Sequence, residues 1–248
     1  MSRWQASSIH LGISLLIVIT LGILLSLTWY PPQYAQAAGG LGLITILAGV
    51  DTCLGPLLTL VVWNIKKASL KLDLAVIVLL QLAGLGYGLH AIFLARPVYV
   101  VFATDRFELK SAVDIPESEL GKADREEFKS LPLTGPRLVS VKPPNDSTER
   151  MRILSSALGG GADVSALPQY YLPYAEAAAG AANRGMPLAR LMERNEDIRK
   201  RIAAYIESAK LDPSRLKYLP LQAKKRSQTM LIDSMTGEIR GIMDIDPW

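Results

Sequence analysis

The stretch LGLITILAGVDTCLGPLLTLVVW, residues 41–63, decides the fold class. It is almost entirely apolar, with a single charged residue, Asp51. Because about 20 helical residues cross the hydrocarbon core of a membrane, this stretch predicts a transmembrane helix. Two more apolar stretches, 9–29 and 74–95, lie on either side of it, and Trp29 and Trp63 mark span ends as interfacial aromatics do. Residues 1–96 are therefore expected to form a membrane domain with three spans.

Residues 97–248 have the pattern of a water-soluble domain. Pro97–Ala103 is a continuous apolar run, and residues 106–111 alternate polar and apolar side chains, as buried and half-buried strands do. Further strands are expected at 137–142, 218–223, 229–233 and 238–245, and helices at 117–129, 146–158 and 187–210. The sequence predicts an α+β membrane protein in which the soluble domain has an antiparallel sheet and several helices.

Basic residues in the short loops predict the orientation. Lys66, Lys67 and Lys71 lie between the second and third spans, whereas the loop 30–40 carries no charge. The positive-inside rule then places residues 64–73 and the N-terminus in the cytoplasm. Residues 97–248 are expected on the outer side of the membrane, in the periplasm or its equivalent.

A cleaved signal peptide is the alternative interpretation of the first span. Ala35-Gln36-Ala37 follows the apolar stretch as a signal-peptidase site would, although that stretch is longer than an ordinary signal core. Cleavage would leave two spans and the same outer location for residues 97–248.

The charge distribution argues against a nucleic-acid partner. Residues 1–96 hold five Lys or Arg against two Asp or Glu, a net charge of +3. Residues 97–248 hold 22 against 21, a net charge of +1. The basic excess of the chain therefore lies beside the spans, and the soluble domain has no basic face that its net charge would indicate.

Most catalytic and metal-binding chemistry is excluded from the soluble domain. Both histidines, His10 and His90, and the one cysteine, Cys53, lie in the membrane domain, so zinc sites and Ser-His-Asp or Cys-His pairs are not possible outside it. An intramembrane aspartyl protease would need two facing carboxyls, but Asp51 and Asp73 differ by roughly 15 Å in depth. We expect no catalytic residue, no metal and no cofactor.

Asp51 is the outstanding residue of the spans, because a carboxyl in lipid is costly. It can contact a client helix or carry a proton, or it can be a buried carboxyl that fixes the packing of three helices. Pro56 follows one turn later and is expected to bend the span. In the third span, Gly84 and Gly88 around Tyr87 form a small-xxx-small face, which another span or a foreign helix could approach closely.

The chain resembles the type IV pilin accessory proteins of the TfpX/TfpZ (FimB-like) family. The resemblance rests on GVDTCLGPLLTLVVW (49–63), LKLDLAVIVLLQLAGLGYG (70–88), ARPVYVVFATDRFELKSA (95–112), LPQYYLPY (167–174) and LIDSMTGEIRGIMDIDPW (231–248). It implies an inner-membrane protein that is paired with a particular major pilin and promotes surface piliation and twitching motility.

The resemblance therefore implies a non-catalytic accessory factor for type IV pilus biogenesis, whose partners are the major pilin, other assembly proteins and membrane lipid. A membrane enzyme that modifies or processes pilin and a periplasmic sensor are the alternatives. The candidate contacts within the membrane are Asp51, Pro56, Gly84, Tyr87 and Gly88. Those in the periplasm are the turn Asp105, Arg106 and Phe107 and the cluster Tyr170, Tyr171 and Tyr174, which form a partner surface if exposed and core if buried.

Overall fold

The computed structural model describes all residues, 1–248, as two compact units. The first unit comprises Met1–Ala35 and Gly39–Arg96, and the second comprises Gln36–Ala38 and Pro97–Trp248. The helices of the first part of the chain are α1 (Arg3–Thr28), α2 (Pro32–Ala38), α3 (Gly40–Val62) and α4 (Leu70–Ala95). Because α1, α3 and α4 are each long and apolar enough to cross a membrane, the three predicted spans are confirmed as helices.

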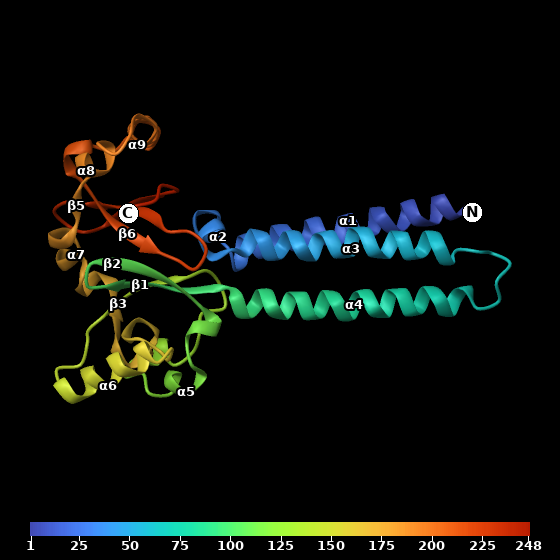
Figure 1. Ribbon diagram of the computed structural model, residues 1–248, viewed down its shortest axis with the longest axis horizontal. Helices are drawn as coiled ribbons and strands as arrows, with labels where there is room; N and C mark the ends of the chain where they lie inside the picture. The colour runs from blue at the N-terminus through green and yellow to red at the C-terminus, as the bar shows by residue number, and fades with distance from the viewer. The chain divides into compact units, whose positions relative to one another are not determined.

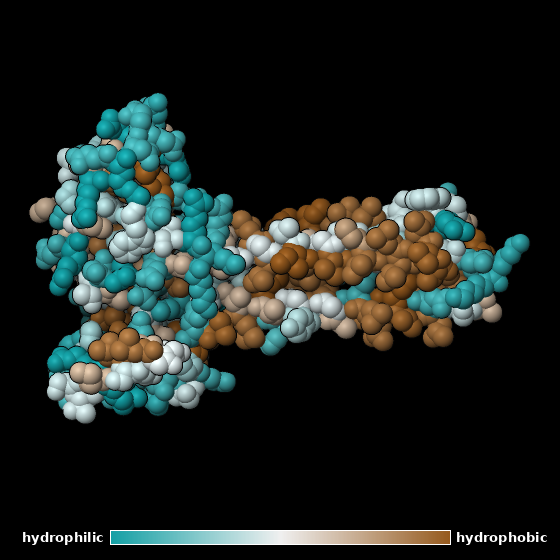
Figure 2. All heavy atoms as spheres, in the orientation of Figure 1, coloured by the Kyte–Doolittle hydropathy of each residue, from teal (hydrophilic) through white to brown (hydrophobic).

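The first helix begins six residues before the apolar stretch that predicted it. Ser2 caps α1 by accepting a hydrogen bond from the backbone N–H of Gln5, whose side chain accepts one from the N–H of Ser2 in return. Helix α3 packs against both α1 and α4, and Figure 1 shows the three helices running alongside one another. Figure 2 shows that hydrophobic side chains cover most of the visible face of these helices, as is typical of a lipid-facing surface.

The second unit is built on one eight-stranded sheet with the order β4-β3-β1-β2-β6-β7-β8, in which β5 also pairs with β6. The strands are β1 (Pro97–Ala103), β2 (Arg106–Ser111), β3 (Arg137–Val141), β4 (Tyr171–Pro173), β5 (Met186–Pro187), β6 (Leu216–Gln222), β7 (Gln228–Asp233) and β8 (Ile239–Met243). Its helices are α5 (Glu117–Leu120), α6 (Ser147–Leu158), α7 (Ala178–Arg184), α8 (Leu188–Met192) and α9 (Glu196–Ser208). The α+β class is therefore confirmed.

The sheet is mixed, whereas the sequence predicted an antiparallel one. Most neighbours are antiparallel, but β1 runs parallel to β3, and β2 runs parallel to β6. The reason is the order of the strands: β3 lies beside β1 and not beside its predecessor β2, and strands two apart in an alternating chain point the same way. As the runs in the sequence indicated, β1 is buried along almost its whole length and β2 alternates.

Two predicted helices are shorter in the structure. The helix expected at 117–129 is only α5, which ends before Gly121 and is followed by a separate 3-10 turn at Glu126–Phe128. The helix expected at 187–210 is interrupted because Asn195 has extended backbone and caps α9, its side chain accepting a hydrogen bond from the N–H of Ile198. Asn195 therefore caps the start of α9 and does not lie inside a continuous helix from 187 to 210.

Two hydrophobic clusters form the core of the second unit. One gathers around β1 and contains Tyr99, Val101, Phe128 and Tyr171; the other joins α8 and α9 to β6 and β7 through Leu191, Ile202, Tyr218 and Leu231. Figure 1 shows the corresponding division, with α5 and α6 near β1–β3 and α8 and α9 near β6. A short parallel pairing, Phe107 with Leu221 and Glu108 with Gln222, joins the two halves of the sheet.

The Asp233 carboxylate stabilises the turn at the end of β7, and its protonation is expected to destabilise the second unit. Its carboxylate accepts hydrogen bonds from the N–H groups of Thr236 and Met235, at 3.0 Å each, and forms ion pairs with Arg215 and Arg240. The backbone hydrogen bonds first, and the arginines in addition, lower the pKa of Asp233 to about 2 from its ordinary value of 3.8.

Because the pKa is lower in the folded chain than in the unfolded one, this stabilisation is complete above the unfolded pKa and is lost as the pH falls toward the folded one. The melting temperature of the detergent-solubilised chain should therefore fall as the pH is lowered from about 4 to about 2. Asp233→Asn should lower the melting temperature at neutral pH and flatten that acid dependence. An unchanged acid profile in Asp233→Asn would contradict the assignment.

Candidate functional site

A polar cluster ties the three long helices together. The imidazole of His10 on α1 lies between Thr59 on α3 and Gln81 on α4, with Nδ1 2.6 Å from the Thr59 hydroxyl and Nε2 2.9 Å from Gln81 Oε1. In the neutral ring Nε2–H donates to the amide oxygen, and Nδ1 accepts from the hydroxyl. Interhelical hydrogen bonds of this kind stabilise membrane helices by about 0.6–2 kcal/mol each.

Small and helix-bending residues of α3 make room for the cluster. A Cβ added to Gly55 would overlap the Gln81 amide and approach His10 Nε2. The next residue, Pro56, has a carbonyl that accepts a hydrogen bond from the Ser7 hydroxyl at 2.9 Å. Both Gly55 and Pro56 are buried, and side chains of α1 and α4 approach the α3 backbone here.

Asp51 lies midway along α3, at the edge of this cluster. The residue is 7% exposed, and its carboxyl forms no hydrogen bond or ion pair; only its backbone carbonyl accepts one, from the Gln81 amide at 3.5 Å. A cavity of about 130 Å³ lies beside it, lined from α1 by His10, Ile13, Ser14 and Ile17, and from α4 by Val78, Gln81, Leu82 and Leu85. We call this space the Asp51 groove.

The Asp51 groove opens on the outer face of the bundle, because several of its lining side chains are exposed. Ile13 and Ile17 on one side and Val78 and Leu82 on the other are each at least 42% exposed. A buried carboxyl in an apolar medium is strongly destabilising unless a donor or a cation meets it. The groove therefore combines an apolar rim with an unpartnered carboxyl on its floor.

The other membrane residues singled out from the sequence are less closely associated with the groove. Gly88 faces α3, because a Cβ there would press on Leu47, so its role is internal packing. Gly84 has no atom within 4 Å of an added Cβ, and Tyr87 is 78% exposed. Gly84 and Gly88 therefore do not form one continuous packing face within this chain.

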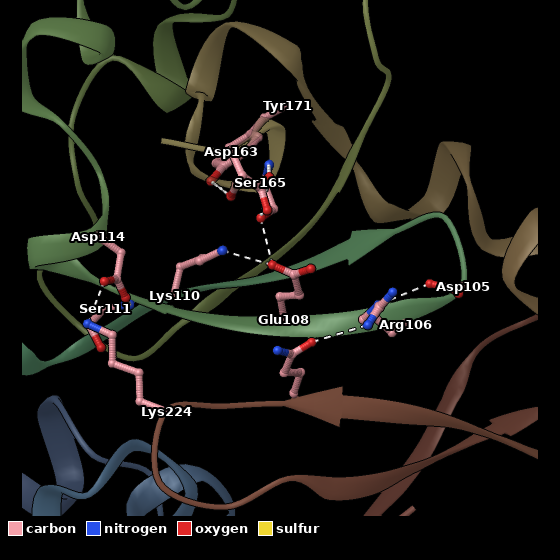
Figure 3. Close-up of polar contacts among 11 residues, drawn as sticks. Asp105, Arg106, Glu108, Lys110, Ser111, Asp114, Asp163, Ser165, Tyr171 and Lys224 are labelled. Carbon is pink, nitrogen blue, oxygen red and sulfur yellow. Dashed lines mark hydrogen bonds and ion pairs between the residues drawn. The ribbon is translucent and has the colours of Figure 1, made fainter. Parts of the chain in front are cut away.

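In the second unit, Asp105 and Arg106 occupy the β1–β2 turn. Arg106 Nε lies 3.1 Å from its neighbour's carboxylate, its guanidinium stands over the Trp248 ring, and it donates to Gln222. Figure 3 shows this pair at the turn, apart from Glu108 and Lys110 further along β2. Both residues have exposed side chains that a partner could reach.

A polar cleft of about 440 Å³ lies further along β2, between it and Lys224. Most of its charges are already paired within the chain, as Figure 3 shows: Glu108 contacts Lys110 at 2.8 Å and the Ser165 hydroxyl at 2.6 Å, and Lys224 contacts Asp114 at 2.5 Å. Asp163, which also lines the cleft, has no ion pair and accepts hydrogen bonds only from Ser165, so the lining carries one carboxylate more than it has lysines.

Three of the proposed soluble contact residues belong to the core. Phe107 is fully buried and packs with Tyr174, whose hydroxyl donates to the carbonyl of Gly237 at 2.6 Å. Tyr171 is buried against Tyr99 and Phe128 and donates to the carbonyl of Ser165. Burial raises the pKa of Tyr174 to about 12 and that of Tyr171 well above its ordinary value. Burial therefore selects the core alternative for Tyr171 and Tyr174, and the Phe107 side chain offers no exposed contact.

Tyr170 differs from its neighbours, because it is only partly buried and lies on the surface beside α6. Its hydroxyl donates to Glu149 Oε1 at 2.9 Å. That carboxylate also pairs with Arg152, and the two hydrogen bonds lower the pKa of Glu149 to about 2. Tyr170 is the member of the tyrosine cluster that a partner can contact.

Comparison with known proteins identifies the family. The family model described as fimbrial assembly protein FimB matches residues 1–39. The fimbrial assembly protein of serogroup I from Dichelobacter nodosus is 30% identical over 245 residues, which covers 98% of this chain and 95% of that protein. The chain belongs to the FimB family of fimbrial assembly proteins. Its predicted resemblance to that family is thereby confirmed.

Two more FimB relatives from Dichelobacter nodosus extend the match. The serogroup E1 protein is 29% identical over 98% of this chain and 95% of its own length. The protein of serogroups C1 and C2 is 38% identical over 121 residues, which is 48% of this chain and 92% of that protein. No solved structure matches the chain. A role in fimbrial biogenesis follows from the family.

Sequence reasoning about this FimB-family chain missed His10, the centre of the polar cluster. The first span was expected to begin at Ile9, which would leave His10 at the membrane edge. The Ser2-x-x-Gln5 capping box was the available signal. It shows that the helix begins at Arg3, so that His10 lies two turns inside it and faces Thr59 and Gln81.

Proposed function

We propose that this FimB-family protein is a non-catalytic accessory factor for type IV pilus biogenesis. It binds the major pilin in the inner membrane and stabilises it for assembly. The observation that carries the proposal is the Asp51 groove, where a buried carboxyl without a partner lies beneath an apolar rim. Such a surface suits another membrane helix better than a soluble substrate, because its rim is apolar and its unpartnered carboxyl lies at mid-span.

The orientation that we propose for the protein in the membrane follows from the charges of its loops. Lys66, Lys67 and Lys71 lie in or beside the loop between α3 and α4, so the positive-inside rule places that loop in the cytoplasm. The second unit then lies in the periplasm. A pilin awaiting assembly would be held through its membrane helix, with its outer part on the same side as the exposed turn at Asp105 and Arg106.

A membrane enzyme that modifies or processes pilin is the competing function. In the polar cleft Glu108 and Asp114 are held in ion pairs, and the soluble unit holds neither histidine nor cysteine, which favours binding over catalysis. The intact mass of pilin from strains with and without this protein separates the two: an unchanged mass is expected. A mass difference that a plasmid copy restores would establish modification instead.

Deletion of the gene is expected to abolish or strongly reduce surface pili and to lower the amount of pilin in the membrane. Immunoblots of sheared surface pili and of membrane fractions measure both quantities. Complementation with the intact chain should restore both quantities. The deletion leaves the other genes of the pathway intact, so that a loss of pili can be assigned to this gene. Normal piliation with unchanged pilin levels in a clean deletion would refute the proposed function.

A further inference from the structure

We propose that the Asp51 groove binds one transmembrane helix of the pilus subunit, and that this helix presents an N–H or O–H donor group to Asp51 at mid-span. The identity of the partner rests on the proposed function above. The chemistry expected of the partner follows from the groove itself. An apolar helix surface would pack against the rim, and a hydrogen-bond donor would meet the carboxyl.

Two polar side chains that face the groove have no partner. Asp51 and Ser14 are 7% and 5% exposed, and neither the carboxyl nor the hydroxyl forms a hydrogen bond. Other hydroxyls of the spans behave differently: those of Thr20, Ser26, Thr28, Thr45 and Thr52 donate to the carbonyl four residues earlier in the same helix. The Ser14 hydroxyl therefore lacks the hydrogen bond that these other hydroxyls make within their own helices, and the Asp51 carboxyl has none either.

No donor of the bundle contacts the Asp51 carboxyl in the structure. Both ring nitrogens of His10 are engaged, Gln81 Nε2 donates to the Asp51 backbone carbonyl, and the Ser14 hydroxyl forms no hydrogen bond. Lipid tails carry no donor, and a buried carboxyl is costly without one. An external donor at the depth of Asp51 therefore completes the site, and a guest helix provides it while burying Ile13, Ile17, Val78 and Leu82.

Site-specific photo-crosslinking in cells that make the host's major pilin tests the inference. The crosslinking residue is placed at Ile17 on α1 or at Leu82 on α4, which both line the groove. Matched controls are Ile19 and Leu80, which are exposed at similar depth but do not line it. We expect pilin adducts, detected with pilin antibody, from the two groove positions and not from the two controls.

Variants at the groove floor then test the donor. Asp51→Leu is expected to reduce the pilin adduct about tenfold, because a hydrogen bond to a buried carboxyl is lost. Asp51→Asn keeps an acceptor oxygen and should retain more of the adduct. If Asp51→Leu impairs folding, Ser14→Ala, which removes one hydroxyl, should still reduce the adduct a few-fold. An adduct unaffected by both Asp51→Leu and Ser14→Ala overturns the inference.

The outcomes separate this inference from the proposed function. Pilin adducts from the turn at Asp105 but none from the groove would overturn the groove and keep the accessory function. Groove adducts made only with a second copy of this chain would overturn the pilin helix as the occupant. The absence of any pilin adduct together with normal piliation in the deletion strain would refute both.

Discussion

Gly237→Ala is expected to destabilise the second unit by about 3 kcal/mol, from about 1–2 kcal/mol of left-handed backbone strain and about 1–3 kcal/mol of overpacking. Gly237 has φ of +74°, and a Cβ built on it would overlap the backbone carbonyl of Ala178. The carbonyl of Gly237 also accepts the Tyr174 hydroxyl, so a shift of this turn would disturb that buried hydrogen bond. A loss of this size is a large share of the 5–15 kcal/mol that stabilises a typical domain.

Gly160→Ala is the matched control for this substitution. Gly160 has φ of +84°, but nothing lies within 4 Å of the Cβ position. It therefore experiences the backbone strain without the overlap. Thermal or denaturant unfolding of the full chain in detergent should show Gly237→Ala to be clearly less stable than Gly160→Ala. Equal melting temperatures would show that the contact with Ala178 relaxes at no cost.

The sequence predicts most of the local structure because local patterns determine it. The three spans, the fully apolar β1 and the alternating β2 follow from composition and period, and the turn at Thr236-Gly237 follows from its residue types. The tertiary consequences are different. Nothing in the local sequence indicates that Gly237 meets the carbonyl of Ala178, or that β3 lies beside β1 and makes the sheet mixed.

The candidate site shows the same limit. Asp51 stands out in the sequence, since a lone carboxyl in an apolar span is conspicuous. Its surroundings do not, because His10 and Gln81 come from different helices and meet only through packing. Phe107 directly follows exposed polar residues of a turn, and the sequence therefore places it among the contact candidates. Its side chain nevertheless faces the core, because strand residues alternate between the two faces of the sheet.

Gly55→Leu is expected to disrupt the three-helix bundle and, with it, the binding of the pilin helix. Even a Cβ at this position would overlap the Gln81 amide and crowd His10, and a leucine side chain is much larger. The hydrogen bonds of His10 to Thr59 and to Gln81 would break as the helices separate. Overpacking and the lost interhelical hydrogen bonds together should cost about 2–4 kcal/mol.

Gly49→Leu provides the matched control on the same helix, because nothing lies within 4 Å of its Cβ position. The two variants introduce the same residue into α3 and differ in what that residue meets. Thermal unfolding in detergent and co-purification of pilin should both fall for Gly55→Leu and stay near wild type for Gly49→Leu. Wild-type pilin binding by a destabilised Gly55→Leu chain would mean that the polar cluster stabilises the bundle without shaping its binding surface.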